Sequence, residues 1–532
     1  MTIIFWAIKI AGMKTVSIFN DVLGPVMRGP SSSHTAASYR LGRLARQLLG
    51  DRPSTARVIF GAGGSYARVY REQNSDLAFV AGIMGLEITE EHFFEVLELA
   101  SASGCRVEFG EEPIPQDDHP NAVRIELISP SGKKIVLLGR SVGGGAVEIR
   151  ELNGWPLLIS GDYYETLLEI PEEKEATVRN LLGSYAQATA RLETIKVPQK
   201  PGLVLLRLAG YRRLSDEEEQ KLSRVSGLTL WQAQPVSFVV VGQPLFKSAA
   251  EMVRLAAASG QSLGRMALRY EAELLGMSEE EVLKEMDFRL KIMLSSVAAG
   301  LKSETLNLQL LEPTAEKIFQ AEKQGKLLGG HLTRAAIRAM AAEHVAASGG
   351  VVCAAPTGGS AGTIPGVVST LIEDVHLPAD RVVLALLAAG AVGLVVAYRA
   401  TFAAEIAGCQ VEIGAAGAMG AAAVVEAAGG TAEQACEAAA ISFQNTMGLV
   451  CDLVQGICEI PCHTRNAVAA ASAFICSDLI VGGYKNHIPL DETIDAVLAV
   501  GRTMPPELRV TSLGGLAVCP SALALKKKER KN

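Results

Sequence analysis

Residues 382–398 read VVLALLAAGAVGLVVAY, the longest apolar run in the chain. Its length lies at the lower edge of what a membrane span needs, and we expect a buried core helix instead. Upstream of it, segments 249–260, 263–277 and 279–301 carry apolar residues at helical spacing. Because the later segments are hydrophobic all round, residues 247–525 are predicted to form a mostly α-helical domain whose helices bury one another.

A second unit, residues 155–242, alternates strand-like and helix-like segments. The expected strands are 165–171, 189–197, 203–211 and 228–236, and the expected helices are 172–186 and 216–227. The resulting order, β-α-β-β-α-β, is the ferredoxin-like pattern found in many small regulatory modules. We therefore expect a compact central module between the two larger parts of the chain.

The first unit, residues 14–150, also mixes the two element types. Segments 57–64 and 124–141 have the character of strands, and segments 33–50 and 89–104 have that of helices. The three glycines of SVGGGAVEI (141–149) mark a place where the backbone turns sharply or passes close to a ligand. The predicted fold class is therefore α+β and multidomain, with an N-terminal α/β part, a central ferredoxin-like module and a C-terminal mostly helical domain.

Composition narrows the classes of partner. The chain has 532 residues, of which 49% are hydrophobic and 20% charged, with a formal net charge of −7. An acidic balance argues against a nucleic-acid or anionic-membrane partner, and the basic run at 526–531 is expected to be a solvated tail. The apolar start MTIIFWAIKIAG contains Lys9 and lacks a small-residue cleavage site, so it is a poor signal peptide. We expect a cytoplasmic protein, with Met13 as a candidate natural start.

Three of the nine cysteines lie in short polar segments within the Ala/Gly-rich C-terminal half: GCQVEIG, GLVCDLVQG and EIPCHTRN. Cys409, Cys451 and Cys462 are too widely spaced for a zinc ribbon or a thioredoxin-type site. Three thiolates from separate loops suit an iron–sulfur cluster that leaves one iron free, since a cluster used only for electron transfer normally has four cysteines. The alternative is that all three are buried structural thiols.

A second motif, GPSSSHT at 29–35, stands immediately before a predicted helix. Hydroxyl groups and free backbone N–H groups at a helix start form an anion site that suits a carboxylate. His34 in that setting would bond a substrate or carry a proton. The alternative is an ordinary Ser/Thr cap beside a surface histidine.

Two further loops are weaker candidates. In DDHPN (117–121), the proline holds His119 in an extended backbone, although an exposed turn is the default interpretation. In APTGGSAGTIPG (355–366), a glycine-rich turn offers N–H groups to an anion, and a plain loop between helices is the alternative. The chain has neither a G-x-G-x-x-G nor an H-E-x-x-H motif, and Lys247 lacks the phosphate loop that a pyridoxal phosphate lysine would need.

Taken together, the three cysteine segments and GPSSSHT resemble the iron–sulfur-dependent L-serine dehydratases (L-serine ammonia-lyases) of bacteria. Residues 14–150 are similar to the β part of that family, 155–242 to its ACT-type module and 247–525 to its α part. The chain thus looks like a fused version of parts that also occur as two subunits. The resemblance implies a small-molecule substrate, L-serine, and a homodimer is expected, with neither nucleic acid nor membrane as partner.

The resemblance also implies roles for individual residues. It makes Cys409, Cys451 and Cys462 the ligands of a [4Fe–4S] cluster whose fourth iron binds the carboxylate and hydroxyl of serine. The implied substrate-binding residues are Ser31, Ser33, Thr35, Asn121, Thr357, Gly359, Ser360 and Gly362. The implied catalytic residues are His34 and His119, with His34 favoured as the proton-transfer group.

The implied reaction is a deaminating dehydration. The iron acts as a Lewis acid on the β-hydroxyl, a base removes the α-proton, and the product hydrolyses to pyruvate and ammonia. Two alternatives stay open: the same chemistry on threonine or cysteine, and a catalytically silent regulatory homologue. The intact cysteine triplet argues against the silent homologue, because a purely structural role requires no such set of three ligands.

The chain departs from the family pattern in several places. It has CDLV (451–454) where CDPV is common, an additional Cys458, and EQNSD (72–76) where a G-H-G-T-D segment is common. The ACT-like unit has IPEEKEA (170–176) in place of the usual Pro-Gly, which puts binding of a regulatory amino acid in doubt. Cys519 lies near the position of a C-terminal cysteine that caps the open iron in some members, and the alternative is an ordinary buried cysteine.

Overall fold

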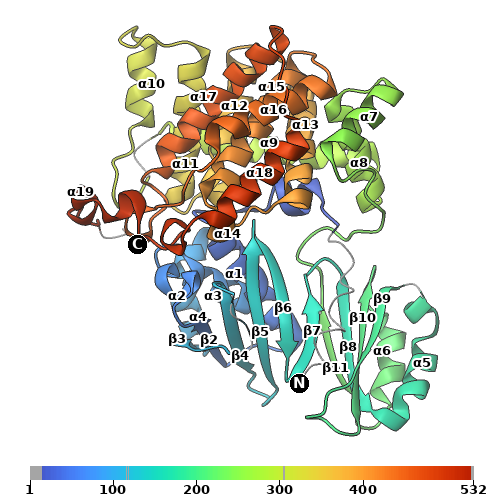
Figure 1. Cartoon of the computed structure of the whole chain (residues 1–532). Helices are drawn as coiled ribbons and strands as arrows, with labels where there is room; N and C mark the ends of the chain where they lie inside the picture. Colours follow the sequence, from blue (N-terminus) through green and yellow to red (C-terminus); the bar gives the residue numbers. More distant parts are fainter. Residues whose placement is uncertain (1–14, 116, 118, 188, 303–305, 529–532) are drawn as a thin grey trace.

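The computed structural model describes residues 15–528 except 116, 118, 188 and 303–305. Two sheets lie side by side on one side of a large helical body (Figure 1). Each of the three parts has its own cluster of buried apolar side chains, and a further small cluster surrounds the cysteines. The mixed α/β, multidomain character expected from the sequence is confirmed. The expectations about the first twelve residues and Met13 lie outside the described residues.

The N-terminal part is built on a six-stranded sheet with strand order β3-β2-β4-β5-β6-β7, in which only the β2–β3 pair is parallel. Its strands are β2 (Thr55–Gly61), β3 (Arg106–Glu112), β4 (Ala122–Ile128), β5 (Lys134–Gly143), β6 (Ala146–Leu152) and β7 (Trp155–Ile159). Its helices are η2 (Ser32–Ala36), α1 (Ala37–Leu49), α2 (Ser65–Val69), α3 (Ser75–Met84), η3 (Glu91–Glu95) and α4 (Val96–Ala102). Segment 124–141, expected to be strand, forms the antiparallel pair β4–β5, whereas α2, α3, β3, β6 and β7 were not predicted.

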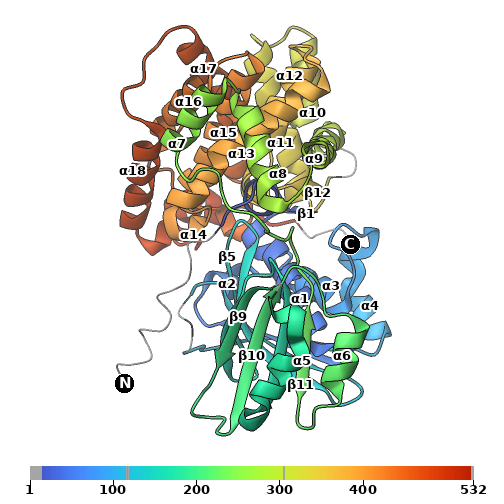
Figure 2. The same cartoon turned by 90° about the vertical axis from the view of Figure 1, so that its right-hand side faces the viewer.

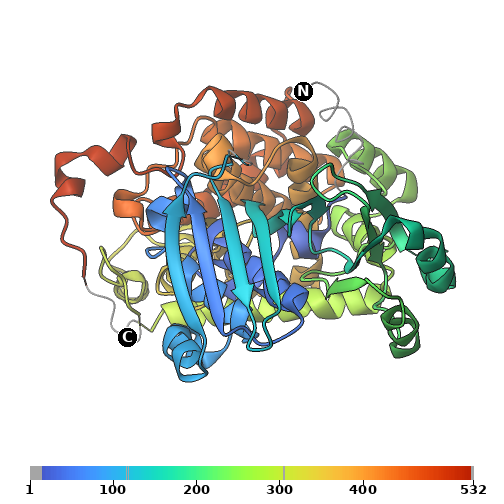
Figure 3. The same ribbon diagram turned by 90° about the horizontal axis from the view of Figure 1, so that it is seen from below.

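The two faces of this sheet differ in chemistry. Helix α1 packs on strands β4, β5 and β6, and apolar side chains of alternating residues fill the space between them. The other face, turned toward the viewer in Figure 3, carries charged side chains that pair across strands, such as Arg57 with Glu126 at 3.5 Å. This arrangement is the usual one for an antiparallel sheet with one solvated face. The residues that this part contributes to the candidate site therefore lie on the buried face of the sheet and in its loops.

The central unit has a four-stranded sheet with strand order β11-β8-β10-β9 and all pairs antiparallel. Its elements are β8 (Tyr164–Pro171), η4 (Glu172–Lys174), α5 (Glu175–Gln187), β9 (Thr189–Ile195), β10 (Leu203–Gly210), α6 (Asp216–Ser223) and β11 (Thr229–Ala233). Helices α5 and α6 cover one face (Figure 2), where Leu168 and Leu206 are buried. Leu167 and Leu205, one residue away on the same strands, join the core of the N-terminal part. The expected β-α-β-β-α-β order is confirmed.

The C-terminal part is a helical body. Its α-helices are α7 (Ala249–Ser259), α8 (Leu263–Leu275), α9 (Glu279–Gly300), α10 (Ala315–Lys323), α11 (His331–Ala347), α12 (Thr363–Glu373), α13 (Ala379–Arg399), α14 (Ala404–Ala407), α15 (Ile413–Ala427), α16 (Ala432–Thr446), α17 (Cys462–Val481), α18 (Leu490–Thr503) and α19 (Pro520–Leu523). Short 3₁₀ turns lie between these helices: η6 (Gly358–Ser360), η7 (Cys409–Val411), η8 (Val454–Gly456), η9 (Pro506–Leu508) and η10 (Gly515–Val518). Ser248, Ser262 and Ser278 cap helices α7, α8 and α9.

Helix α13 contains the apolar run at 382–398 and lies at the centre of the helical body, as predicted. By length and composition, α13 and α17 would each be able to cross a bilayer. In the fold, however, 78% of the apolar window of α13 and 50% of that of α17 are buried. For α13 this is the environment of a core helix.

The first described residues belong to the helical body, a contact that the sequence did not predict. The turn η1 (Ile18–Val22) packs on α13, where Gly390 and Gly393 leave room for Ile18 and Val22. Strand β1 (Val26–Arg28) then pairs antiparallel with β12 (Val351–Cys353). Because the chain passes through the helical body before it enters the six-stranded sheet, the segment that follows β1 lies between the two parts.

Candidate functional site

Four cysteines line one small cavity between the helical body and the N-terminal part. Cys409 lies in η7, Cys451 in a loop, Cys458 after η8, and Cys462 at the start of α17. All four are free and at most 6% exposed. The predicted triplet therefore converges although its members come from separate segments, and a fourth thiol joins it.

The loop that carries Cys451 is held by the C-terminal segment. The backbone N–H of Cys451 donates to the carbonyl of Leu508 at 2.9 Å, and the N–H of Val510 donates back to the carbonyl of Cys451 at 3.0 Å. The N–H of Leu516 donates to the Asp452 carboxylate at 2.8 Å. Residues 508–516 thus hold the Cys451 loop, and within this segment Val510 lines the cavity.

The thiols and the groups around them change one another's pKa. The thiol of Cys451 lowers the pKa of Cys409 through a hydrogen bond, and the Arg465 guanidinium acts in the same direction. Arg465 is itself tied to Asp452 at 3.0 Å. The adjacent Cys458 thiol and burial raise the pKa of Cys462. Close-packed thiols of this kind lose their protons together most readily when a metal binds them.

These residues fit an iron–sulfur cluster by the chemistry of their donors. Soft thiolates select iron–sulfur clusters, copper(I) and zinc over hard cations. Cys409, Cys451 and the carboxylate of Glu412 offer ligand atoms within 4.8 Å of one another. The cavity that the four thiols line together with neighbouring residues encloses about 20 Å³.

The GPSSSHT segment reaches the same cavity from the N-terminal part. Ser31 and Ser33 line the cavity together with the cysteines. Ser31 also caps the helical turn η2, accepting from the backbone N–H of His34 at 3.2 Å. The segment is therefore both a helix cap and part of the cavity wall.

His34 lies directly behind these two hydroxyl groups and is only 1% exposed, so it is not a surface histidine. Its Nδ1 is 3.2 Å from the Ser31 hydroxyl and 3.1 Å from that of Ser33, and its Nε2 is 3.0 Å from Ser65. Burial lowers its pKa, against the opposing charge of Glu405. The ring is thus held neutral and connected to the cavity through Ser33.

Glu405, on helix α14, was not predicted and connects the two parts of the molecule. Its carboxylate accepts from the Ser33 hydroxyl at 2.8 Å and from the Asn121 side-chain amide at 3.2 Å. The backbone N–H of Asn121 donates to Nδ1 of His119 at 3.1 Å. Asn121 is buried and His119 half-buried, so DDHPN is not simply an exposed turn. Burial, followed by the charge of Arg140, lowers the pKa of His119.

The remaining predicted residues are close by but serve partly structural contacts. The Thr35 hydroxyl donates to the carbonyl of Gln73 at 2.7 Å. Gly359 lines the cavity, and the Thr357 and Ser360 hydroxyls lie 3.0 Å apart inside the turn that contains it. The N–H of Gly362 donates to Asn466 at 3.2 Å. The turn is therefore more than a plain loop between helices, because Gly359 also lines the cavity.

Asn466, another residue that the sequence did not single out, joins this turn to the cysteine helix. Its side-chain amide donates to the carbonyls of Gly359 at 2.9 Å and Cys462 at 3.0 Å. At Gly358 a Cβ atom would lie 2.7 Å from the carbonyl oxygen of Pro30 and 2.7 Å from the N–H nitrogen of Ser32. The glycine thus permits close approach of the turn to GPSSSHT.

Three more polar side chains around the cavity had no sequence signal. Gln73, in the EQNSD segment, lines the cavity, and its side-chain oxygen has no hydrogen-bond partner in the described chain. Burial and the charge of Cys409 raise the pKa of Glu412, and burial and the charge of Cys458 raise that of Glu343. The backbone N–H of Gly362 lies near Glu343 but donates to Asn466. Both carboxyl groups are held toward their neutral form.

Cys519 does not share this environment. It is exposed, and its sulfur faces the carbonyl of Gly515 at 3.8 Å. The expectation of a buried cysteine at this position is wrong. The side chains that line the cavity do not include it.

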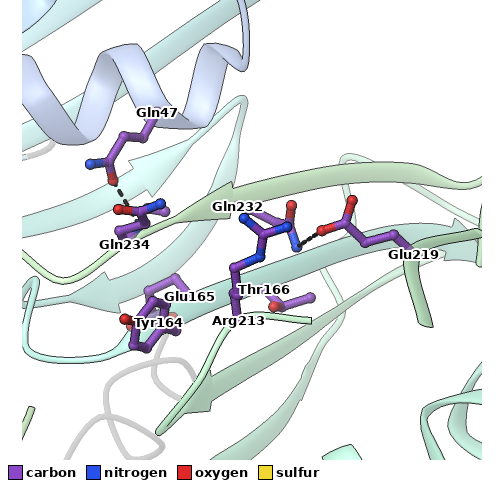
Figure 4. A pocket seen from close by; sticks show the side chains of 9 residues that line it. Gln47, Tyr164, Glu165, Thr166, Arg213, Glu219, Gln232 and Gln234 are labelled. Atoms are coloured by element: carbon purple, nitrogen blue, oxygen red, sulfur yellow. Dashed lines mark hydrogen bonds between the residues drawn. The ribbon is translucent and has the colours of Figure 1, made fainter. Parts of the chain in front are cut away.

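Two of the larger pockets elsewhere on the described chain have partly polar walls. One, of about 320 Å³, lies between α1 and the four-stranded sheet and is lined by polar side chains such as Gln47 and Gln234 (Figure 4). The other, of about 330 Å³, is lined by Arg40, Asp162 and other polar residues. Neither shares a lining residue with the cysteine cavity, which is where the predicted residues converge.

Comparison with known proteins gives a consistent result. Residues 215–517 match the family described as serine dehydratase alpha chain. The chain is 39% identical over 285 residues to a probable L-serine dehydratase alpha chain of Bacillus subtilis, covering 53% of this chain and 95% of that protein. It is 33% identical over 219 residues to a probable L-serine dehydratase beta chain of the same organism, covering 41% and 96%. The L-serine dehydratase alpha chain of Peptoniphilus asaccharolyticus is 35% identical over 275 residues, covering 51% and 94%.

Proposed function

The chain belongs to the serine dehydratase family, with alpha-type and beta-type parts fused, and from this premise we propose that it converts L-serine to pyruvate and ammonia. The observation that supports this most directly is that Ser31 and Ser33 line the same cavity as Cys409, Cys451 and Cys462. A carboxylate-binding segment beside a set of thiolates is what a metal-assisted dehydration of a small hydroxy amino acid requires.

The proposed cofactor is a [4Fe–4S] cluster held by Cys409, Cys451 and Cys462. When bound, it supplies a Lewis acid that makes the β-hydroxyl a better leaving group. The protein's own contribution is to keep the site dry, since all three cysteines are buried. Water exclusion strengthens every electrostatic contact that the substrate makes in the cavity.

Proton transfer is assigned to the chain formed by Ser33, His34 and Glu405. The Ser33 hydroxyl lines the cavity and lies 2.8 Å from Glu405 and 3.1 Å from Nδ1 of His34. A neutral imidazole behind a hydroxyl group is suited to receive the α-proton through that hydroxyl. His119 is the second candidate, because it is linked to the cavity through Asn121 and Glu405.

Substrate binding is assigned to Ser31, Thr35 and Asn121 and to the turn at 357–362. Hydroxyl and N–H groups around a buried cavity orient a carboxylate without adding a charge. Gln73, whose side-chain oxygen is buried without a partner, is suited to accept from the substrate ammonium group. The turn is pinned by Asn466, so its groups keep a constant distance from Cys462.

The remaining assignments concern the whole protein. The proposed domains are a β-type domain at 14–150, an ACT-type module at 155–242 and an α-type domain at 247–525. The β-α-β-β-α-β order and the sheet order of the central unit support an ACT-type module. The protein is further assigned as a homodimer in the cytoplasm. L-serine is its small-molecule partner.

The decisive experiment is turnover by the full-length protein purified without oxygen. Pyruvate formation from L-serine, together with visible iron–sulfur absorbance and bound iron and sulfide, is the expected result. L-threonine and L-cysteine are the matched substrates, and faster turnover of either would change the substrate assignment. Bound cluster without turnover of any of the three would favour a silent homologue.

A further inference from the structure

Cys458 lies in the cysteine cavity although the predicted ligand set does not include it. It is 6% exposed and lines the cavity with Cys409, Cys451 and Cys462. Its thiol is within hydrogen-bonding range of Cys462, just as Cys409 and Cys451 are within range of each other. Four thiols therefore face one space, in two adjacent pairs.

The backbone around Cys458 is held firmly. The carboxylate of the next residue, Glu459, accepts three backbone N–H groups, from Gln309 at 2.6 Å, Leu310 at 2.9 Å and Leu311 at 2.8 Å. Glu459 is itself only 1% exposed. A buried carboxylate that is satisfied in this way anchors the loop. The position of the Cys458 thiol in the cavity is therefore a property of the fold.

Packing alone does not account for this cysteine. The other buried cysteines, Cys105, Cys353, Cys436 and Cys476, lie in the large apolar cores of the N-terminal part and the helical body. Cys458 instead belongs to the small cluster that contains the three predicted ligands. It also lies close enough to the buried carboxyl groups of Glu343 and Glu412 to act on both.

We propose that Cys458 is a fourth thiolate ligand of the iron–sulfur cluster in the resting protein. The inference rests on the cofactor assignment made above and changes its coordination. Four cysteines are the usual ligand set of a [4Fe–4S] cluster, and four cysteine thiols line this one cavity. The exposed Cys519 is less suited to this position, since its sulfur faces a carbonyl outside the cavity.

The proposal has a chemical consequence for substrate access. With four thiolates bound, no iron would be open to the substrate until the bond between iron and the Cys458 sulfur broke; the sulfur would keep the electron pair as a thiolate, and a substrate oxygen would take its place on iron. Cys458 thus blocks the iron that would bind substrate, although it is not one of the three ligands predicted from the sequence.

The test uses the full-length protein, isolated without oxygen, as wild type, Cys458→Ser and Cys458→Ala. Cys476→Ser, on helix α17 but in the apolar core, is the matched control. The iron and acid-labile sulfide contents per protein chain are measured first. Mössbauer spectra without substrate then show whether one iron differs from the others, and EPR after mild ferricyanide oxidation reports a three-iron cluster.

Wild type and Cys476→Ser should show irons with only sulfur ligands and little three-iron signal. Both Cys458 variants should keep a four-iron cluster, show one distinct iron, and give a several-fold larger three-iron signal. A distinct iron already present in wild type, with unchanged behaviour in the Cys458 variants, would overturn the proposal. If wild type bound no iron and sulfide, the cofactor assignment itself would fail, and L-serine turnover measured in parallel separates that outcome from a misassigned ligand.

Discussion

Helix α15 (Ile413–Ala427) begins just after Cys409. The helix buries mostly apolar side chains, whereas the neighbouring cysteine cavity buries many polar ones. Every residue of α15 is buried, and most are alanine, glycine or valine. The cavity beside it gathers thiols, hydroxyl groups and carboxyl groups from both ends of the chain. In the first region close packing sets which residues are tolerated. In the second, each polar group is retained because of a specific partner or ligand.

The largest expected effect follows from replacing one thiol of the cavity. Cys451→Ser should abolish both the iron–sulfur absorbance and L-serine turnover, because one iron loses a soft ligand. Cys436→Ser, a buried cysteine of the helical core, should leave both largely intact. Absorbance spectra and pyruvate assays under anaerobic conditions check this. A full cluster and normal turnover in Cys451→Ser would return that cysteine to a structural role.

The next largest effect is expected at His34, which lies behind the Ser31 and Ser33 hydroxyl groups that line the cavity. His34→Ala should lower kcat by roughly 10²–10⁴-fold, the size associated with a proton-transfer group. The cluster absorbance should persist, because the cysteine ligands lie in other segments. His92→Ala, at an exposed position, is the control. Near-normal kcat in His34→Ala would leave this histidine as part of a helix start.

In the apolar core, a comparable change should act on stability alone. Leu386→Ala, at a position on α13 that is fully buried, should lower the free energy of unfolding by about 2–5 kcal/mol. Leu479→Ala, at a position 46% exposed, should change it by less than about 0.5 kcal/mol. Denaturant titration gives both values. If Leu386→Ala reduced turnover of the folded protein as well, the two regions would be coupled more closely than their packing indicates.

The smallest expected effect tests a carboxyl group inside the apolar core. Glu271 accepts from the backbone N–H groups of Ile18 and Phe19, and burial raises its pKa to about 7. Because the pKa is higher in the folded state, the folded state binds more protons, and stability from this group falls as the pH rises from about 4.5 to about 7. Glu271→Gln should remove this dependence.

The relevant measurement is the difference in unfolding free energy between Glu271→Gln and wild type across that pH range. It should shift in favour of the variant by up to about 3 kcal/mol as the pH rises. Glu273→Gln, at an exposed position on the same helix, is the control and should give a flat difference. Parallel pH profiles for Glu271→Gln and wild type would show that Glu271 keeps an ordinary pKa.

Much of the fold followed from local patterns. The apolar run at 382–398 predicted α13, and the alternation within 155–242 predicted the β-α-β-β-α-β order. Helices α2 and α3 were missed because glycines and polar residues at 61–76 resemble a loop, and because α3 is apolar on all sides. The insertion of η1 against α13 was missed because its signal lies in Gly390 and Gly393, far along the chain.

The sequence by itself determined the helical core, the central module and the residue types of the site, because hydrophobic period and motif spacing are local properties. Only the tertiary structure decided that Ser33 meets Glu405, 372 residues away, and that Cys458 joins the other thiols. Burial of apolar surface is non-directional and does not encode which loops come together. That choice emerges when two bodies pack against each other, and a buried polar group such as Glu405 then keeps its place because leaving it unpaired would cost free energy.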